Sequence, residues 1–167
     1  MTDPEGSMTD LLIRHAHVIT MDDAGTQIDD GAVAITGRRI SAVGPDAEVG
    51  QTSATRVIDA RGAPLHPGLV ETHLHASYQT YRGVIPDGIR EVDVFSTVEV
   101  GFYGQVTEED EELSGLLASM EMVRNGTTCF MEAGTFLFPD AAARAATTVG
   151  IRALLGDVVI NDDPGSF

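Results

Sequence analysis

Short apolar stretches separated by Gly and Asp turns fill the first third of the chain. Strands of this length between such turns are typical of all-β structure. The pattern predicts strands at residues 11–20, 32–36, 39–43 and 56–59, with turns at Asp22–Gly25 and Asp29–Gly31. We therefore expect half of a small β-sandwich over residues 10–66, preceded by a disordered leader at residues 1–9.

Strands alternate with helices from residue 67 onward. A strand at 69–75 precedes a long segment without periodicity, 76–106, and loops of that length are often functional. Thr107, the acidic residues after it and a final Asn125-Gly126 predict a helix. Its helical stripe of apolar residues comprises Leu113, Leu116, Leu117, Met120 and Val123. A strand at 127–131, a helix at 140–148 and a strand at 151–160 complete the order. This alternation predicts βαβ units with a parallel sheet, hence an α/β fold over residues 67–167.

The charge of the chain disfavours two classes of partner. The sequence holds 26 acidic and 10 basic residues, a net charge of −16. Nucleic acid and anionic lipid are both bound through clusters of Lys and Arg, which this chain lacks. Its apolar runs all fall short of the ~20 residues that span a bilayer. The single cysteine, Cys129, excludes an intrachain disulfide, and the N-terminus lacks a signal pattern, so we expect a cytoplasmic protein.

A histidine pair, His73 and His75, closes the strand predicted at residues 69–75. Side chains two apart on a strand share a face, so both imidazoles project the same way and are suited to one metal ion. The spacing alone is weak evidence, because His15 and His17 repeat it in the first strand. We interpret that first pair as structural, together with His66, since no loop or second set of ligands lies near them in the sequence.

The surroundings of the second pair give it a family context. The segment Pro67-Gly-Leu-Val-Glu-Thr-His-Leu-His75 resembles the first-strand signature of the amidohydrolase superfamily. Residues 11–20, 57–62 and 126–132 look like further landmarks of that family. Arg82-Gly83 follows the pair at a distance similar to that in the cytosine-deaminase-like and triazine-hydrolase-like subgroup.

The resemblance implies a composite β-sandwich and a (β/α)8 TIM barrel with its active site at the C-terminal ends of the strands. It implies a mononuclear or binuclear metal site with His73 and His75 as ligands. Zinc is the first choice of metal, with cobalt, iron and manganese as alternatives. The subgroup takes further ligands from a His of strand five and an Asp of strand eight. A Glu serves it as proton shuttle, assisted by a His of strand six.

Those later residues do not fit into this chain. A barrel of this kind needs about 250 residues, and no histidine follows His75. We therefore assign no catalytic residue here and expect the N-terminal portion of an incomplete barrel. Its partner would be a C-terminal fragment, produced by a nick near Phe167, or a separate subunit. A denaturing gel and an intact mass of the purified protein test this expectation.

Four further residues are candidates for substrate binding. Tyr78, Gln79 and Arg82 follow the metal pair and either line a substrate pocket or belong to an ordinary surface loop. Glu132 ends the next strand at the mouth of the barrel. It either contacts substrate or lies behind the residues that do, or it is an ordinary capping or solvated acid.

The leading functional hypothesis is a metal-dependent hydrolase. A metal-activated water would displace an amine, chloride or thiolate from a small heterocyclic or xenobiotic-like substrate. We expect the complete unit to form a homo-oligomer. The alternative is a non-catalytic protein of the same fold used for assembly. A third hypothesis, an independent β-rich binding module, is disfavoured by the βαβ pattern.

Overall fold

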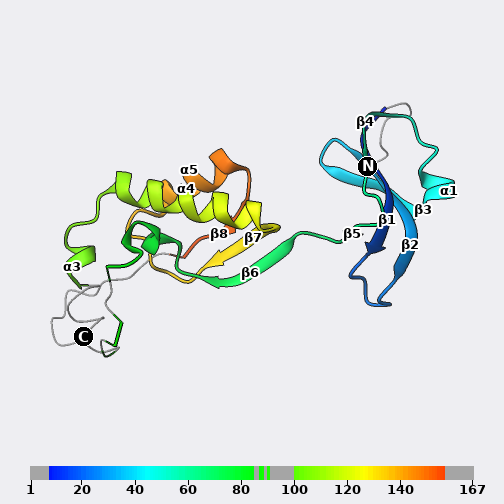
Figure 1. Cartoon of the computed structure of the whole chain (residues 1–167). Coiled ribbons are helices and arrows are strands. Elements are labelled where there is room, and N and C mark those ends of the chain that lie inside the picture. The colour runs from blue at the N-terminus through cyan, green and yellow to red at the C-terminus, as the bar shows by residue number, and fades with distance from the viewer. Residues whose placement is uncertain (1–7, 85–86, 89, 91–99, 157–167) are drawn as a thin grey trace. The chain divides into compact units, whose positions relative to one another are not determined.

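A computed structural model describes residues 8–84, 87–88, 90 and 100–156 (Figure 1). The chain divides between Pro67 and Gly68 into two units, each built on its own sheet. Residues 1–7, which make up most of the expected leader, lie outside the described residues, and the first strand begins at Thr9.

Strand β1 (Thr9–Ile19) lies inside the sheet of the first unit. It pairs antiparallel with β2 (Gln27–Thr36), which pairs antiparallel with β3 (Arg39–Pro45). On its other side β1 pairs in parallel with β4 (Ala54–Asp59) and β5 (Pro64–Leu65), and a short helix, α1 (Asp46–Val49), follows β3. The buried apolar residues come from β1 and β2: Leu12, Ala16, Val18, Ala32, Val33 and Ala34. The strands predicted in this region are confirmed.

One of the two predicted turns is wrong. The turn at Asp22–Gly25 is present, with the Gly25 N–H donating to the Asp22 carbonyl at 2.9 Å. Residues Asp29–Gly31 instead continue strand β2, where Gly31 pairs with Ala16. A Cβ at Gly31 would lie 2.7 Å from a methyl carbon of Val18. Glycine at this position therefore makes room for a neighbouring side chain in the sheet and does not mark a turn.

The second unit is a parallel sheet with helices on one face (Figure 1). Its strands β6 (Leu69–Leu74), β7 (Thr127–Glu132) and β8 (Arg152–Leu154) lie in that order. Helices α4 (Glu108–Arg124) and α5 (Pro139–Val149) connect them, so the predicted βαβ order is confirmed. The long segment 76–106 contains a 3-10 helix, η1 (Ala76–Tyr81), and one helical turn, α3 (Val100–Tyr103). Within the described residues, no helix is both long and apolar enough to cross a membrane.

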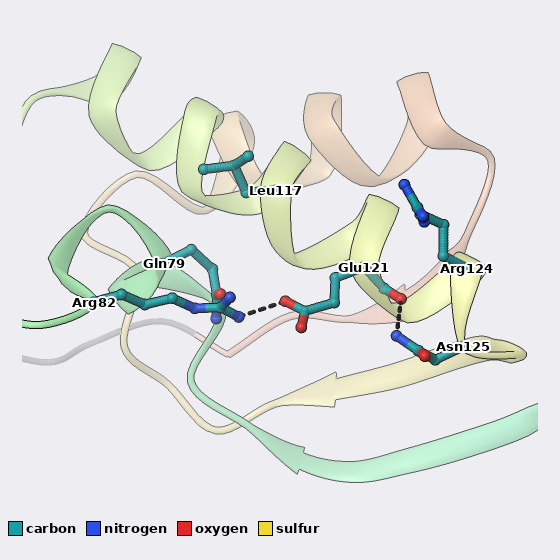
Figure 2. Close-up of a pocket in the computed structure, with 6 residues that line it drawn as sticks. All are labelled: Gln79, Arg82, Leu117, Glu121, Arg124 and Asn125. Atoms are coloured by element: carbon teal, nitrogen blue, oxygen red, sulfur yellow. Dashed lines mark hydrogen bonds and ion pairs between the residues drawn. The ribbon is translucent and has the colours of Figure 1, made fainter.

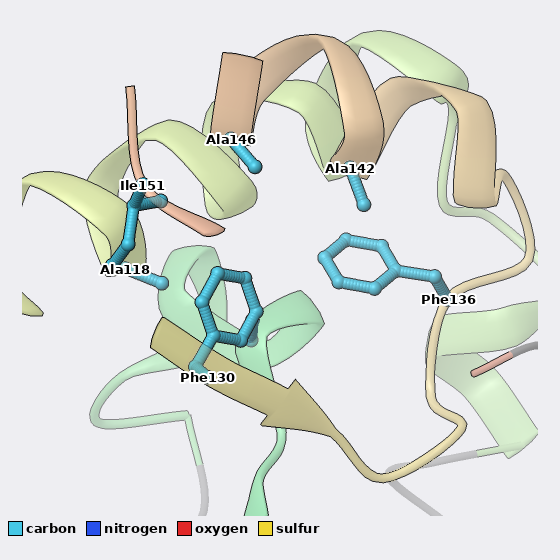
Figure 3. Packing of buried hydrophobic residues seen from close by; sticks show 7 residues of the cluster. Ala118, Phe130, Phe136, Ala142, Ala146 and Ile151 are labelled. Atoms are coloured by element: carbon cyan, nitrogen blue, oxygen red, sulfur yellow. The ribbon is translucent and has the colours of Figure 1, made fainter. Parts of the chain in front are cut away.

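Two phenylalanines lie at the centre of the hydrophobic core between this sheet and its helices (Figure 3). Phe130 of β7 and Phe136 of the following loop are 2% and 0% exposed. Small side chains from both helices and a residue before β8 surround them: Ala118, Ala142, Ala146 and Ile151. The helices approach closely at Gly115, where a Cβ would lie 2.9 Å from the Ala145 Cβ.

This close approach decides which face of α4 is buried. The buried face consists of small and polar residues, Glu111, Ser114, Gly115, Ala118 and Ser119. The apolar stripe seen in the sequence lies largely on the open side, with Leu113, Leu117, Met120 and Val123 between 41% and 49% exposed. The predicted helix is therefore confirmed, but its apolar residues are not what holds it to α5 and the sheet.

The N-terminus of α4 has a reciprocal cap. The Asp110 backbone N–H donates to the Thr107 hydroxyl, and the Asp110 carboxylate accepts from the Thr107 backbone N–H and hydroxyl at 3.0 and 2.7 Å. These bonds satisfy donors that the helix leaves unpaired. The side-chain hydrogen bond from Thr107, followed by its backbone bond, holds the pKa of Asp110 below its ordinary value.

We predict that Thr107→Ala destabilises the fold by about 1 kcal/mol at neutral pH, the usual cost of losing such a cap. Because the folded-state pKa of Asp110 is lowered, its ionised form contributes stability above the pKa of the unfolded state. That contribution is lost as the pH falls through the folded pKa. The difference between wild type and Thr107→Ala should therefore narrow in acid, as measured by urea unfolding at several pH values. Thr147→Ala, an exposed substitution within α5, should cost nothing; a penalty independent of pH would contradict this account of the cap.

Candidate functional site

Two imidazoles, those of His73 and His75, lie at the carboxyl end of strand β6. Leu74 packs against the core, while His73 and His75 on either side of it are exposed. Their ring centroids lie 5.0 Å apart and the ring planes meet at 87°. The expected strand ends one residue early, so His75 lies just beyond β6, at the start of η1. Two adjacent imidazoles in this arrangement are suitable ligands for one metal ion.

Hydrogen bonds to β7 hold both ends of β6. The Leu69 N–H donates to the Gly126 carbonyl and the Ala133 N–H donates to the Leu74 carbonyl, each at 2.9 Å. Close packing helps at the start of the strand, because a Cβ on Gly68 would lie 2.1 Å from the Thr128 hydroxyl oxygen. Glycine therefore lets the chain enter β6 directly against β7.

The other three histidines all have hydrogen-bond or ion-pair partners nearby. His15 Nδ1 lies 3.1 Å from an Asp30 oxygen. His17 lies 3.2 Å from both Asp29 and Gln27 through its two ring nitrogens. His66 Nδ1 lies 2.7 Å from the Pro67 carbonyl oxygen. Within the described parts of the chain, the imidazoles of His73 and His75 have no hydrogen-bond partner, so they remain available to a ligand.

The structure separates the candidate substrate residues of η1 into two places. The Tyr78 ring lies 5.7 Å from the His75 ring, beside the histidine pair. Gln79 and Arg82 instead face α4, where Arg82 forms an ion pair with Glu121 (Figure 2). They line a surface pocket of about 540 Å³ whose other residues are Leu117, Glu121, Arg124 and Asn125.

Glu132 is buried at the end of β7 and bonds to the chain that follows it. Its carboxylate accepts from the Gly134 N–H at 2.7 Å and from the Thr135 N–H at 3.0 Å. The Thr135 hydroxyl also donates to it. Glu132 is only 3% exposed. These bonds correspond to local capping, one of the roles expected for Glu132, and a solvated acid is excluded by its burial.

Sequence reasoning missed Ser77 and Thr135 as parts of the site. Ser77 Oγ donates to Thr135 Oγ1 at 2.8 Å across 58 residues of sequence. The spacing Glu132-x-Gly134-Thr135 was a readable signal for a carboxylate that caps the turn after a strand. No local pattern indicates the partnership of Thr135 with Ser77.

An aromatic cluster adjoins His75 through Tyr78 and contains all three tyrosines of the chain. Tyr78 and Tyr103 join hydroxyl to hydroxyl at 2.9 Å, and both rings contact Phe102, which is 2% exposed. The Tyr81 ring lies 4.0 Å from the Phe102 ring, and burial, followed by the nearby charge of Asp110, raises the pKa of Tyr81. Phe102 and Phe136 are thus packing residues, whereas Tyr103 also makes polar contacts.

The described residues do not complete a metal site. They contain no group of three or more His, Cys, Asp or Glu side chains placed to hold one ion. A catalytic zinc site commonly uses three protein ligands and a water. The end of β6 accordingly offers two candidate ligands, His73 and His75.

Sequence comparison identifies the family and the relatives that this chain resembles. The model of the amidohydrolase family matches residues 65–166. A 5-methylthioadenosine/S-adenosylhomocysteine deaminase of Nitratidesulfovibrio vulgaris is 39% identical over 155 residues, which cover 90% of this chain and 34% of the relative. A 5'-deoxyadenosine deaminase of Methanosarcina mazei is 36% identical over 164 residues, covering 95% of this chain and 36% of the relative. The chain thus spans about a third of the length of these curated relatives.

Two solved structures share the fold. A triazine hydrolase from Arthrobacter aurescens superposes with a TM-score of 0.79 at 27% identity, covering 95% of this chain and 38% of that one. An adenosine deaminase from Xanthomonas campestris with bound zinc also gives 0.79, at 31% identity, covering 89% of this chain and 34% of that one. The α/β architecture and the likeness to triazine hydrolases expected from the sequence are therefore confirmed.

We predict that Gly68→Ala destabilises the second unit by about 1–3 kcal/mol, the usual cost of overpacking, because its Cβ would overlap the Thr128 side chain. Thr128→Gly removes that side chain, so the double variant should be less destabilised than the sum of the single ones. A double-mutant cycle by urea unfolding measures this coupling. Additive penalties would show that Thr128 is not what restricts residue 68.

Proposed function

The chain belongs to the amidohydrolase family, and from this membership we propose that it supplies the metal-binding strand of a metal-dependent hydrolase. The reaction would displace an amine from a small heterocycle, with an adenine nucleoside as the first choice of substrate. Both curated relatives described above are named as deaminases of adenine nucleosides, which favours amine over chloride or thiolate as leaving group. Triazine hydrolases remain the source of the chloride alternative.

The availability of His73 and His75 carries the proposal. Two histidine pairs of identical spacing occur in the chain, and among the residues that the structure describes local partners engage only the first. The second pair is exposed at the carboxyl end of a parallel strand, the edge at which α/β enzymes build their sites. Exposed imidazoles in that position have ring nitrogens that can bind a metal without first losing another contact.

Zinc fits this pair of nitrogen ligands, as do other divalent metals that accept imidazole. When bound, such an ion lowers the pKa of a coordinated water and so supplies a nucleophile near neutral pH. Zinc is present in the related adenosine deaminase and atrazine chlorohydrolase structures. The residues of this chain would hold and orient the ion from one side.

The remaining ligands would come from polypeptide beyond these 167 residues. Three parallel strands leave the outer edges of β6 and β8 without a partner strand in the described sheet. Apolar side chains on its strands are also exposed, including Val70 at 61% and Leu154 at 59%. We propose that the missing part of a (β/α)8 barrel continues this sheet and covers the exposed stripe of α4.

The test uses the complete enzyme, meaning this chain together with the polypeptide that carries the other ligands. His73→Ala and His75→Ala should each abolish stoichiometric zinc binding and reduce activity more than about 100-fold. This loss exceeds the roughly 10- to 100-fold effect that is typical when a residue hydrogen-bonded to a metal ligand is removed. His17→Ala is the matched control and should retain zinc and activity. Zinc is measured by elemental analysis. Ammonia release is measured with 5'-deoxyadenosine and S-adenosylhomocysteine, and chloride release with a chlorinated triazine.

The outcomes separate the alternatives. Zinc with chloride release but no ammonia release would replace the deaminase proposal with a dechlorinating one. Full activity in His73→Ala after chelation would overturn metal dependence. A complete protein that binds no metal and turns over none of these substrates would favour the non-catalytic assembly protein.

A further inference from the structure

Thr135 uses all of its polar groups in contacts that meet beside the candidate metal ligands. Its N–H and hydroxyl donate to Glu132, and its hydroxyl oxygen accepts from Ser77 at 2.8 Å. Its carbonyl oxygen accepts from the Tyr103 hydroxyl at 3.2 Å. Thr135 is 7% exposed, so these bonds are largely shielded from water.

Two of the contacts of Thr135, those with Ser77 and with Tyr103, connect it indirectly to His75. The first acts through the backbone, because Ser77 lies two residues after His75 in η1 and is fully buried. A second anchor, the Ser114 hydroxyl donating to the Ser77 carbonyl at 2.7 Å, fixes the same turn from α4. The chain leaving His75 is therefore held to two separate elements.

The second contact acts through aromatic rings. Since the single proton of the Tyr103 hydroxyl is donated to the Thr135 carbonyl, the Tyr78 hydroxyl is the donor in the 2.9 Å bond between the two tyrosines. The Tyr78 ring, oriented in this way, lies 5.7 Å from the His75 ring and tilted by 35°. The His75 ring thus has both the Tyr78 ring and the His73 ring as neighbours.

We propose that Thr135, seated on the buried carboxylate of Glu132, is a positioning residue that orients His75 for metal binding. This inference rests on the proposed function, since it assumes that the histidine pair holds a metal. An exposed imidazole samples several rotamers, and fixing one of them costs conformational entropy. A neighbouring ring and a fixed backbone turn remove that freedom before the metal binds. Mutation of a residue that orients a metal ligand in this manner typically weakens metal affinity about 10- to 100-fold.

The experiment measures the zinc dissociation constant of the complete enzyme by competition with a chromophoric chelator. Thr135→Val preserves the shape of the side chain and removes its hydroxyl, and should raise the dissociation constant about tenfold. Thr135→Ser restores the hydroxyl and should recover most of the affinity. Tyr103→Phe, which breaks the link between Tyr78 and the Thr135 carbonyl, should shift the constant in the same direction by a smaller factor.

Tyr81→Phe is the matched control. Tyr81 belongs to the same aromatic cluster, but within the described residues its hydroxyl has no hydrogen-bond partner. Its zinc affinity should equal that of wild type. If Thr135→Val fails to fold, as judged by circular dichroism, the comparison of Tyr103→Phe with Tyr81→Phe carries the test.

Each result has a defined meaning. Wild-type affinity in both Thr135→Val and Tyr103→Phe would overturn the positioning role while leaving the metal site intact. Equal weakening by Thr135→Val and Thr135→Ser would overturn it too, because the hydroxyl would then not be responsible. Absence of zinc from the wild-type enzyme would overturn the proposed function itself, and this inference with it.

Discussion

Parallel pairing between β6 and β7 is the interaction on which the candidate site depends. Hydrogen bonds join the two strands at both ends, from Leu69 to Gly126 and from Ala133 to Leu74. Because parallel strands end at the same edge, His75 and Glu132 are delivered to that edge from segments far apart in sequence. The contact of Ser77 with Thr135 exists only because these two strand ends coincide. Disrupting the register of this pair would therefore separate the segment of His75 and Ser77 from Thr135 and Glu132.

Two buried carboxylates hold the loop that follows β7. Glu132 accepts from backbone N–H groups at its start, and Glu111 of α4 accepts from the N–H groups of Leu137 and Phe138 at 2.9 and 2.6 Å. The latter bonds satisfy donors before α5, whose N-cap residue makes no side-chain cap. Glu111 is 0% exposed and Glu132 is 3% exposed. The structure tolerates this burial of two acids because both carboxylates accept hydrogen bonds. In a chain of net charge −16, some of the acidic residues are thus structural parts and not solvated surface.

The two histidine pairs show why spacing does not identify a ligand. Both have one residue between the histidines, on a strand, yet Asp30, Asp29 and Gln27 engage the first pair. A ring nitrogen that already has a hydrogen-bond partner must give it up before it can bind a metal, which opposes binding through that nitrogen. The second pair has no such partners in the described chain and lies at a strand end. Placement and the absence of competing bonds, taken together, distinguish a candidate ligand from a structural histidine.

Local chemistry was sufficient to predict most elements of this protein. The Thr107 cap, the alternation of strands with helices and the signature around His73 are all encoded within a few neighbouring residues. The family resemblance, carried by such segments, was likewise available from sequence alone. What the sequence did not reveal depends on partners distant along the chain. Gly31 resembled a turn residue because its close neighbour, Val18, belongs to another strand.

Contacts between segments that are distant in the sequence also explain the other differences between expectation and structure. The apolar stripe of α4 is exposed because Gly115 and other small side chains of α4 face α5. The close packing of α5 against α4 selects that small-residue face for burial. Gln79 and Arg82 point toward α4, away from their neighbour Tyr78, because Glu121 and the pocket around it lie there. The sequence by itself determined most of the strands, the Thr107 cap and the candidate ligands. Only the tertiary structure decided which faces are buried and which side chains lie beside the candidate ligands, because those outcomes depend on contacts between segments that are far apart in the sequence.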